Sequence, residues 1–253
     1  MKKNVFKKSD YVLNDVDNFK QLTNGQHLVT ICGEYHDIVK NCSNNNIKSI
    51  GDYVEDRVNK NSDISVLLEA WDTVNNGFLG KVKTNFNNIH SKAMKSVYNK
   101  IGNNPDKLVL WDIRREFLTT DQQNKLYHKD FMDMKPYVES IERFVDYLNN
   151  NRDLVISDYI KDFIEPLMRK IMVKPLVWDI REIWIRIADL IVLNHLRNTE
   201  DSEIIVLCGD NHSKNLLKYL TKYAGYSVIA GGKSRGSCIY TYEPVDLQTL
   251  IKN

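Results

Sequence analysis

A chain of 253 residues with 42% hydrophobic residues can bury a sizeable core, which excludes an intrinsically disordered protein. The formal net charge is only +2 and the basic and acidic residues are dispersed, so no nucleic-acid partner is expected. The longest apolar stretch, 183–196, is broken by Arg186 and Asp189, so no membrane span is expected. Four scattered cysteines and an N-terminus without an apolar signal core favour a cytoplasmic location.

The first part of the chain predicts strands that alternate with helices. Apolar, β-branched runs closed by Gly or a polar residue predict buried strands, and apolar residues at helical spacing predict amphipathic helices. In chain order we expect a short helix at about 16–22, a turn at Asn24-Gly25, a strand at 28–32, a helix over 47–58, a strand at 64–69, a helix near 89–101 and a strand at 108–111.

The middle of the chain has a helical apolar period throughout, and the last part returns to strands. We expect helices at 134–148, 154–171 and 178–196, a strand at 203–207, a helix at 214–223, strands at 226–230 and 237–242 separated by a Gly231-Gly232 turn, and a short closing helix at 245–251.

Strand–helix–strand spacing is typical of parallel sheets with right-handed crossovers. The predicted fold is therefore α/β, with a mostly parallel central sheet flanked by helices. We expect one domain over 1–253, in which residues 119–198 form a helical insertion that caps the sheet.

Two similar motifs stand at strand ends, Gly33-Glu34-Tyr35-His36 and Gly209-Asp210-Asn211-His212. Each follows an apolar run that reaches a Cys-Gly pair. With 11 glycines and 6 histidines in 253 residues, roughly 0.26 Gly-x-x-His matches are expected by chance. Two matches in the same context are therefore unlikely to be accidental, and they indicate a site.

Further polar side chains follow the other predicted strands. Glu69 ends the second strand, and Asp112 and Arg114 follow the third. Ligands of open parallel sheets bind outside the carboxyl ends of the strands, so we expect His36, Glu69, Asp112 and His212 to converge there. Two histidines among carboxylates can hold a divalent metal, or act as acid and base on an ester or amide. Arg114 can polarise a carbonyl group in the transition state, or it can simply pair with a surface acid.

Structural roles compete with each of these hypotheses. A histidine after a strand and Gly can cap the following helix, Glu69 alone is most simply a solvated strand end, and Arg186 has Glu182 and Asp189 one turn away as ion-pair partners. Cys32 and Cys208 each precede a motif histidine by four residues, which raises a Cys₂His₂ zinc site, but buried thiols are the better interpretation.

The two motifs, together with Glu69, Arg186 and the 216–228 ending, resemble the superfamily of TIKI proteases, TraB pheromone-shutdown proteins, erythromycin esterases and ChaN haem-binding proteins. The resemblance covers about 28–112 and 183–242. Asp210 stands where many relatives have an apolar or small residue. The resemblance implies a hydrolase of amides or esters, metal-dependent if TIKI-like and using histidine as base on water if esterase-like. The ChaN branch implies a haem or other cofactor binder without turnover.

From the residues and this resemblance we expect a hydrolase acting on a small molecule or peptide. The expected catalytic residues are Glu34, His36, Glu69, Arg186 and His212, and the expected substrate-binding residues are Asp112, Arg114 and Asp210. A divalent metal (Mn, Co or Zn) on His36, His212 and Glu69 is the metal-dependent form of this expectation, and haem is the alternative cofactor.

The two histidines differ in their surroundings. His212 precedes a helix whose dipole disfavours a protonated imidazole, so we expect it to stay neutral and to bind a metal or donate a hydrogen bond. His36, beside Glu34 and with Glu69 as a further candidate neighbour, is expected to be the more basic of the two and the base that takes a proton from water. Because both are expected at an exposed rim, replacing either by Ala should leave thermal stability nearly unchanged.

Overall fold

The computed structural model describes residues 6–14, 16–34, 46–70, 91–128, 133–174, 176–233 and 239–244. The chain divides into two compact units. We call Met1–Leu110 with Glu200–Asn253 the sheet unit, and Trp111–Thr199 the helical unit. The predicted insertion, 119–198, lies inside the helical unit. The predicted closing helix, 245–251, lies outside the described residues.

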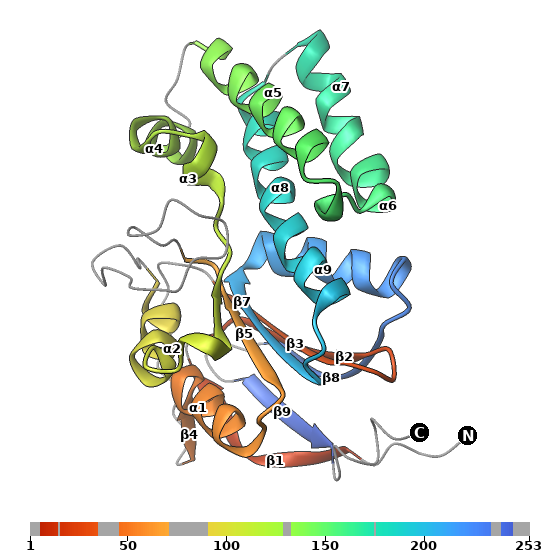
Figure 1. Cartoon of the computed structure of the whole chain (residues 1–253). Helices are drawn as coiled ribbons and strands as arrows, with labels where there is room; N and C mark the ends of the chain where they lie inside the picture. The colour runs from red at the N-terminus through yellow and green to blue at the C-terminus, as the bar shows by residue number, and fades with distance from the viewer. Residues whose placement is uncertain are drawn as a thin grey trace. The chain divides into compact units, whose positions relative to one another are not determined.

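Within the described residues, the sheet unit contains a six-stranded sheet of order β6-β5-β7-β3-β2-β8 (Figure 1). The four strands β6, β5, β7 and β3 are parallel to one another, while β2 runs antiparallel to both β3 and β8. This confirms a mostly parallel α/β sheet. The bounds are β2 Asn18–Thr23, β3 Leu28–Glu34, β5 Ile64–Leu68, β6 Leu108–Leu110, β7 Glu203–Gly209 and β8 Ser227–Lys233.

The central strands are buried along their whole length, which their sequences explain. Every residue of β3, β5 and β7 is buried. Strands covered on both faces are continuous apolar runs instead of alternating patterns, and β-branched residues fit their pleated surface. The sequence predicted all three strands for this reason.

The helix predicted at 16–22 is wrong, because this segment is strand β2. It forms a hairpin with β3, in which Phe19 pairs with Cys32 and Leu22 with Val29. The turn was predicted correctly: Gly25 has a φ of 89°, and the Asn24 side chain accepts hydrogen bonds from two following backbone amides. An Asn-Gly turn before a strand is a strong hairpin signal, and it outweighs the weak helical spacing of the short segment.

The predicted Gly231-Gly232 turn is also wrong, since both glycines lie inside β8. Gly231 pairs with Lys20 of β2, and a Cβ at Gly231 would lie 2.7 Å from the Lys20 Cδ. Glycine inside a strand marks a close approach of another chain segment, and here the approaching segment is the Lys20 side chain.

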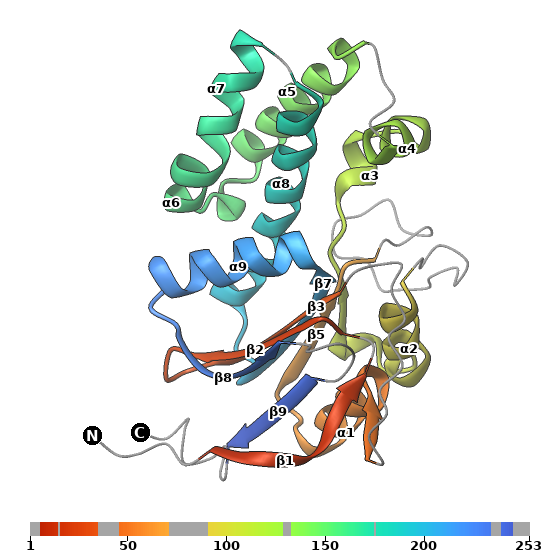
Figure 2. The ribbon, with the colours of Figure 1, turned by 180° about the vertical axis from the view of Figure 1, so that it is seen from behind.

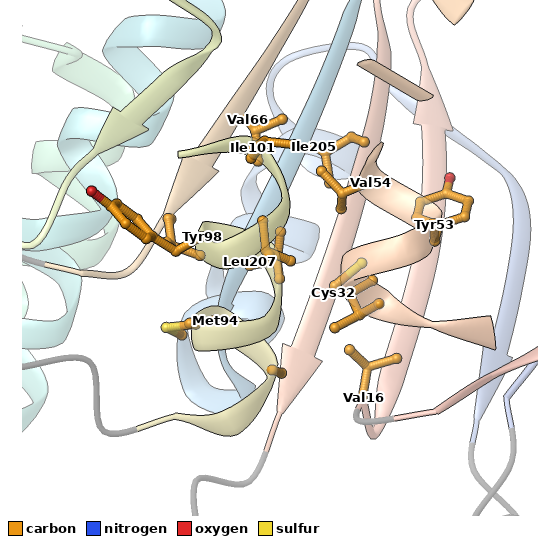
Figure 3. Packing of buried hydrophobic residues seen from close by; sticks show 14 of the residues in the cluster. Val16, Cys32, Tyr53, Val54, Val66, Met94, Tyr98, Ile101, Ile205 and Leu207 are labelled. Atoms are coloured by element: carbon orange, nitrogen blue, oxygen red, sulfur yellow. The ribbon is translucent and has the colours of Figure 1, made fainter. Parts of the chain in front are cut away.

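Helices cover both faces of this sheet. Figures 1 and 2 show α9 (Asp210–Lys222) on one face and α1 (Ile50–Lys60) and α2 (Lys92–Ile101) on the other. Ser49 and Ser91 cap α1 and α2 by accepting a hydrogen bond from a first-turn amide. The core under α1 and α2 includes the buried side chains labelled in Figure 3, such as Cys32, Val54, Met94 and Leu207.

A smaller sheet completes the described part of the sheet unit. It has the order β4-β1-β9, in which β1 (Phe6–Asn14) is parallel to β4 (Ile47–Ser49) and antiparallel to β9 (Ile239–Pro244). Leu13 of β1 and Ile239 of β9 are fully buried and belong to the same core as α1. The first and last described strands of the chain are thereby joined side by side.

A buried ion pair ties α1 to the amino end of β7. Arg57 of α1 donates two hydrogen bonds to Glu203, at 2.8 and 2.7 Å, and Asn61 donates a third at 3.1 Å. The Glu203 side chain is 1% exposed. A buried carboxylate needs such partners, and the bidentate geometry suits a guanidinium group.

The helical unit contains the predicted helices, with one interruption. Its described helices are α3 Arg114–Phe117, α4 Thr120–His128, α5 Lys135–Asn150, α6 Ser157–Tyr159, α7 Glu165–Val173 and α8 Val177–Asn198, and its described turns of other helix types are η3 Arg152–Leu154 and η4 Ile160–Ile164. The single helix predicted over 154–171 is thus divided. Its centre, η4, is a π-helix that ends two residues before Pro166, whose missing amide and ring sterics disfavour a regular α-helix in the preceding turn.

Aromatic packing and one buried polar pair hold the helical unit together. Phe117, Phe144 and Trp184 are buried with ring centroids 5.4–6.3 Å apart. Tyr159 donates a 3.0 Å hydrogen bond to Asp189, and both residues are fully buried. Burial and the neighbouring carboxylate raise the pKa of Tyr159 well above its ordinary value, so its hydroxyl remains a donor. No helix in the described ranges is long and apolar enough to cross a membrane.

Gly33 allows α9 to approach β3 closely. A Cβ at Gly33 would lie 2.7 Å from Ser213 Oγ and 3.0 Å from Ser213 Cβ. We predict that Gly33→Ala lowers the free energy of unfolding by about 1–3 kcal/mol, because α9 has to move away from the sheet. Urea denaturation measures this loss.

The control is the cycle with Ser213→Gly. In the Gly33→Ala/Ser213→Gly double variant, the alanine methyl group meets no serine side chain, so the double variant should be more stable than the sum of the two single effects predicts. Strictly additive effects would contradict the close approach.

Candidate functional site

The strand register brings the two motif strands side by side. β3 pairs with β7 so that Glu34 lies opposite Gly209 and Gly33 opposite Cys208. β5 lies on the other side of β7, and the Glu69 amide donates a 2.9 Å hydrogen bond to the carbonyl of Leu207. The carboxyl ends of three parallel strands therefore meet at one edge of the sheet, as the sequence predicted.

At this edge Glu69 and His212 are in direct contact. Nε2 of His212 lies 3.2 Å from Oε1 of Glu69, and each side chain is 4% exposed. The other carboxylate oxygen, Oε2, accepts a 2.6 Å hydrogen bond from the backbone amide of Gly209. Glu69 therefore contacts the end of β7 through Oε2 and the first turn of α9 through Oε1.

The local path of the chain explains how His212 reaches Glu69. The helix predicted to begin at Lys214 begins at Asp210 instead, directly after β7. His212 therefore lies in the first turn of α9, where its side chain can turn back toward the strand ends. Asp210 is also in this turn and forms an ion pair with Lys214. Asp210 is thus a helix-start carboxylate as well as a predicted substrate-binding residue.

Two electrostatic effects act on the His212 imidazole in opposite directions. The amino end of α9 disfavours positive charge on the ring, as the sequence analysis noted. The Glu69 carboxylate at 3.2 Å favours positive charge on the ring, and residue spacing alone did not predict this partner for His212. With Nε2–H directed at Glu69, the lone pair of the neutral ring is on Nδ1. Glu69 therefore selects the tautomer and stabilises the imidazolium ion that forms when Nδ1 takes a proton.

The expectation that His212 lies at an exposed rim is wrong. The first turn of α9 reaches the surface through Asn211 and Lys214, but His212 itself is 3% exposed. Replacing it by Ala removes a hydrogen bond to the buried Glu69 carboxylate, which commonly costs about 1.5–3 kcal/mol. Thermal stability should therefore fall in His212→Ala, and activity has to be measured per folded molecule.

Glu34 lies at the same edge but alternates to the other face of the sheet. Side chains of a strand alternate between faces, so Glu34 shares the face of Cys32, whereas Glu69 lies in line with Gly33 on the face covered by α9. Burial, and then the charge of Glu34, raise the pKa of the Cys32 thiol. His36, the second motif histidine, lies outside the described residues. Its predicted convergence with His212 stays a prediction.

The two cysteines do not point to a common metal. Cys32 lies opposite Leu207 and Cys208 lies opposite Gly33, so their side chains leave opposite faces of the sheet. Both are buried, and neither forms a disulfide. The described ranges contain no group of three or more His, Cys, Asp or Glu side chains arranged to hold a metal ion. Because His36 is not among the described residues, the expected His36–His212–Glu69 metal set stays a prediction.

The other predicted site residues belong to the helical unit. Arg114 forms a bidentate pair with Asp112, with Nε 2.7 Å from Oδ1 and Nη2 2.8 Å from Oδ2, at the start of α3. Arg186 contacts Glu182 at 2.9 Å and donates a 2.7 Å hydrogen bond to the carbonyl of Phe163 in η4. The Asp112–Arg114 pair stabilises the start of α3, and Arg186 stabilises the π-helical segment η4. A catalytic or substrate-binding role for them stays a prediction.

The backbone amide of Gly209 is the site group that sequence reasoning missed. Side-chain patterns carry no information on which amide a carboxylate will accept from. The signal that was available is the position of Glu69 directly after a strand, since a carboxylate there can reach the end of a neighbouring parallel strand.

No protein-family model, curated protein or solved structure matches the chain.

Burial predicts that Cys32 and Cys208 resist alkylation in the native protein. Thiolates react and thiols do not, and the raised pKa of Cys32 keeps it protonated at neutral pH. Iodoacetamide treatment followed by peptide mass spectrometry should find both residues unmodified in the native protein and modified after denaturation. Rapid native alkylation of either one would contradict this packing.

Proposed function

We propose that this protein is a hydrolase that cleaves an ester or amide bond, in which Glu69 and His212 act as a paired base. The observation that carries the proposal is the buried contact between Glu69 and His212 at the carboxyl end of a parallel sheet, with Glu69 held by the Gly209 amide. Ligands of this class of sheet bind at that edge. A carboxylate that orients a histidine is the arrangement that hydrolases use to activate water or a nucleophile.

In the proposed mechanism, Nδ1 of His212 takes a proton from a water molecule as the water attacks the carbonyl carbon. Glu69 accepts a hydrogen bond from Nε2–H throughout, and its charge stabilises the imidazolium ion that forms. The same imidazolium then returns the proton to the leaving alcohol or amine. The Gly209 amide keeps the carboxylate in place, so that the imidazole is oriented before the substrate binds.

This proposal changes the expected division of roles between the histidines. The carboxylate contact supports His212, instead of His36, as the base. His36 then serves as the second polar group of the site, placed by its motif after the neighbouring strand β3. The proposed substrate is a small molecule or peptide.

The metal-dependent form of the proposal uses the same contacts. A histidine that binds a metal through one nitrogen commonly donates its other N–H to a carboxylate, which fixes the ring. Nδ1 of His212 and a nitrogen of His36 would be the ligands, and Glu69 would orient His212 instead of binding the metal. A bound Mn²⁺, Co²⁺ or Zn²⁺ would supply an activated water.

The test compares Glu69→Gln with a matched change on the same sheet. Gln keeps the size of the side chain and an oxygen that can accept from the backbone amide of Gly209. Its NH₂ group then faces Nε2 of His212 as a donor, which favours the tautomer with the proton on Nδ1. We expect kcat/KM for p-nitrophenyl acetate and for a peptide p-nitroanilide to fall roughly 10²- to 10⁴-fold. His212→Gln should lose a similar factor, and the double variant little more, because the two residues act as a unit.

Glu203→Gln is the control, because it replaces another buried carboxylate, at the opposite end of β7. It should lower stability through the loss of the Arg57 pair and leave kcat/KM per folded molecule unchanged. Equal losses in Glu69→Gln and Glu203→Gln would show that the Glu69–His212 pair is structural. No hydrolysis by the wild-type protein, together with a haem absorption band on haem addition, would support the cofactor-binding alternative.

A chelator separates the two forms of the mechanism. In the metal-dependent form, ethylenediaminetetraacetate should abolish hydrolysis, and Mn²⁺, Co²⁺ or Zn²⁺ should restore it in the wild-type protein but not in His212→Gln. In the metal-free form, the chelator should leave the rate unchanged.

A further inference from the structure

The junction between α7 and α8 exposes four large apolar side chains within seven residues. Met172 is 65% exposed, Val173 89%, Leu176 47% and Trp178 61%. We call these four residues the apolar tip. They stand where α7 ends and α8 begins, at the end of the helical unit seen in Figures 1 and 2.

This concentration is unlike the rest of the described surface. The described residues include seven exposed large hydrophobic side chains, and four of them form the apolar tip. Single exposed apolar residues are ordinary, whereas a contiguous group marks an interaction surface. The tip is not loosely packed core, because the adjacent residues Leu167, Ile171 and Ile180 are buried and anchor both helices.

Basic side chains flank the apolar tip along the sequence. The ten residues 169–178 include Arg169, Lys170 and Lys174 and no acidic residue. All three cations are exposed, and Arg169 contacts Glu165 at 3.4 Å in a surface ion pair. On the α8 side, the guanidinium of Arg181 lies 6.0 Å from the centre of the Trp178 ring. Segment 165–181 has four cations against the two acids Glu165 and Asp179, so its formal charge is +2.

We propose that the apolar tip docks this protein on an anionic lipid surface. Exposed Trp, Leu, Val and Met side chains enter the boundary between headgroups and acyl chains, where an amphipathic Trp ring is favoured. Lys and Arg side chains extend their apolar stems along the same boundary and place their charges among anionic headgroups. The combination of apolar exposure with an exclusively basic flank over 169–178 is complementary to such a surface. The inference is independent of the proposed hydrolase activity.

The test is flotation of the full-length protein with vesicles of phosphatidylcholine containing ~30 mol% phosphatidylserine, a composition with a negative surface potential. We expect binding to these vesicles at about 0.1 M salt, weaker binding at about 0.5 M salt, and little binding to pure phosphatidylcholine. Binding should also shift the fluorescence of Trp178 to shorter wavelength. That shift should be absent in Trp178→Phe. The other described tryptophans, Trp111 and Trp184, are already buried, so their fluorescence should change little on binding.

Two variants of the apolar tip are compared with one matched control on the sheet unit. Val173→Ser/Trp178→Ser and Lys170→Ser/Lys174→Ser should each lower the vesicle partition coefficient roughly 10-fold or more. Val228→Ser/Lys60→Ser changes an exposed valine and an exposed lysine of the sheet unit and should leave it unchanged. Circular dichroism confirms folding.

Three outcomes would overturn the proposal. These are no binding to anionic vesicles, equal losses in the tip and control variants, and binding that does not depend on phosphatidylserine. Light scattering without vesicles adds a fourth: a dimer that the tip variants dissociate would show that a second copy of the chain covers the tip instead of lipid.

Discussion

Parallel hydrogen bonding between β3 and β7 joins two segments from opposite ends of the chain, and the arrangement of the candidate site depends on it. The register places Gly33 beside Cys208 and Glu34 beside Gly209, so both Gly-x-x-His motifs leave the sheet at the same edge. β5 on the far side of β7 then delivers Glu69 to that edge. The β5–β7 pairing lets the Glu69 carboxylate accept from the Gly209 amide and contact His212 at once.

The same contacts show the structural roles of the two motif glycines. Gly209 supplies an amide to Glu69 directly before α9 begins, and Gly33 lets the Ser213 side chain of α9 pack against β3. The first turn of α9 is therefore fixed from two sides, by a hydrogen-bonded carboxylate and by a close backbone approach. His212 lies in this turn, and its orientation follows from the packing of the sheet unit.

Much of this arrangement could be predicted from residue types and their spacing. The buried strands are continuous apolar runs, and the acidic or histidine residues that follow them have to emerge at one edge of a parallel sheet. Strand β2 was missed because its apolar residues fit helical spacing, whereas its pairing with β3 and β8 is a long-range effect. The early start of α9 and the π-helical η4 depend on local backbone geometry that spacing does not reveal.

What the sequence could not predict is burial at the site, and burial changes how the site has to be tested. The side chains of His212 and Glu69 are each 4% exposed, so they contribute to folding as well as to any chemistry. Removing either side chain should lower both stability and activity. Only variants that keep side-chain size, such as Glu69→Gln, can therefore separate the two contributions. Glu34, on the other face of the sheet, requires the same care because it is also buried.

The most direct measurement of the central claim is the tautomer of His212 by long-range ¹H–¹⁵N correlation NMR on histidine-labelled protein. His212→Gln assigns the signals among the six histidines of the chain. If Glu69 orients the ring, the neutral form of His212 carries its proton on Nε2, and Glu69→Gln changes that pattern while Glu203→Gln does not. A His212 ring protonated on Nδ1 in the neutral form, or one that Glu69→Gln leaves unchanged, would contradict the account.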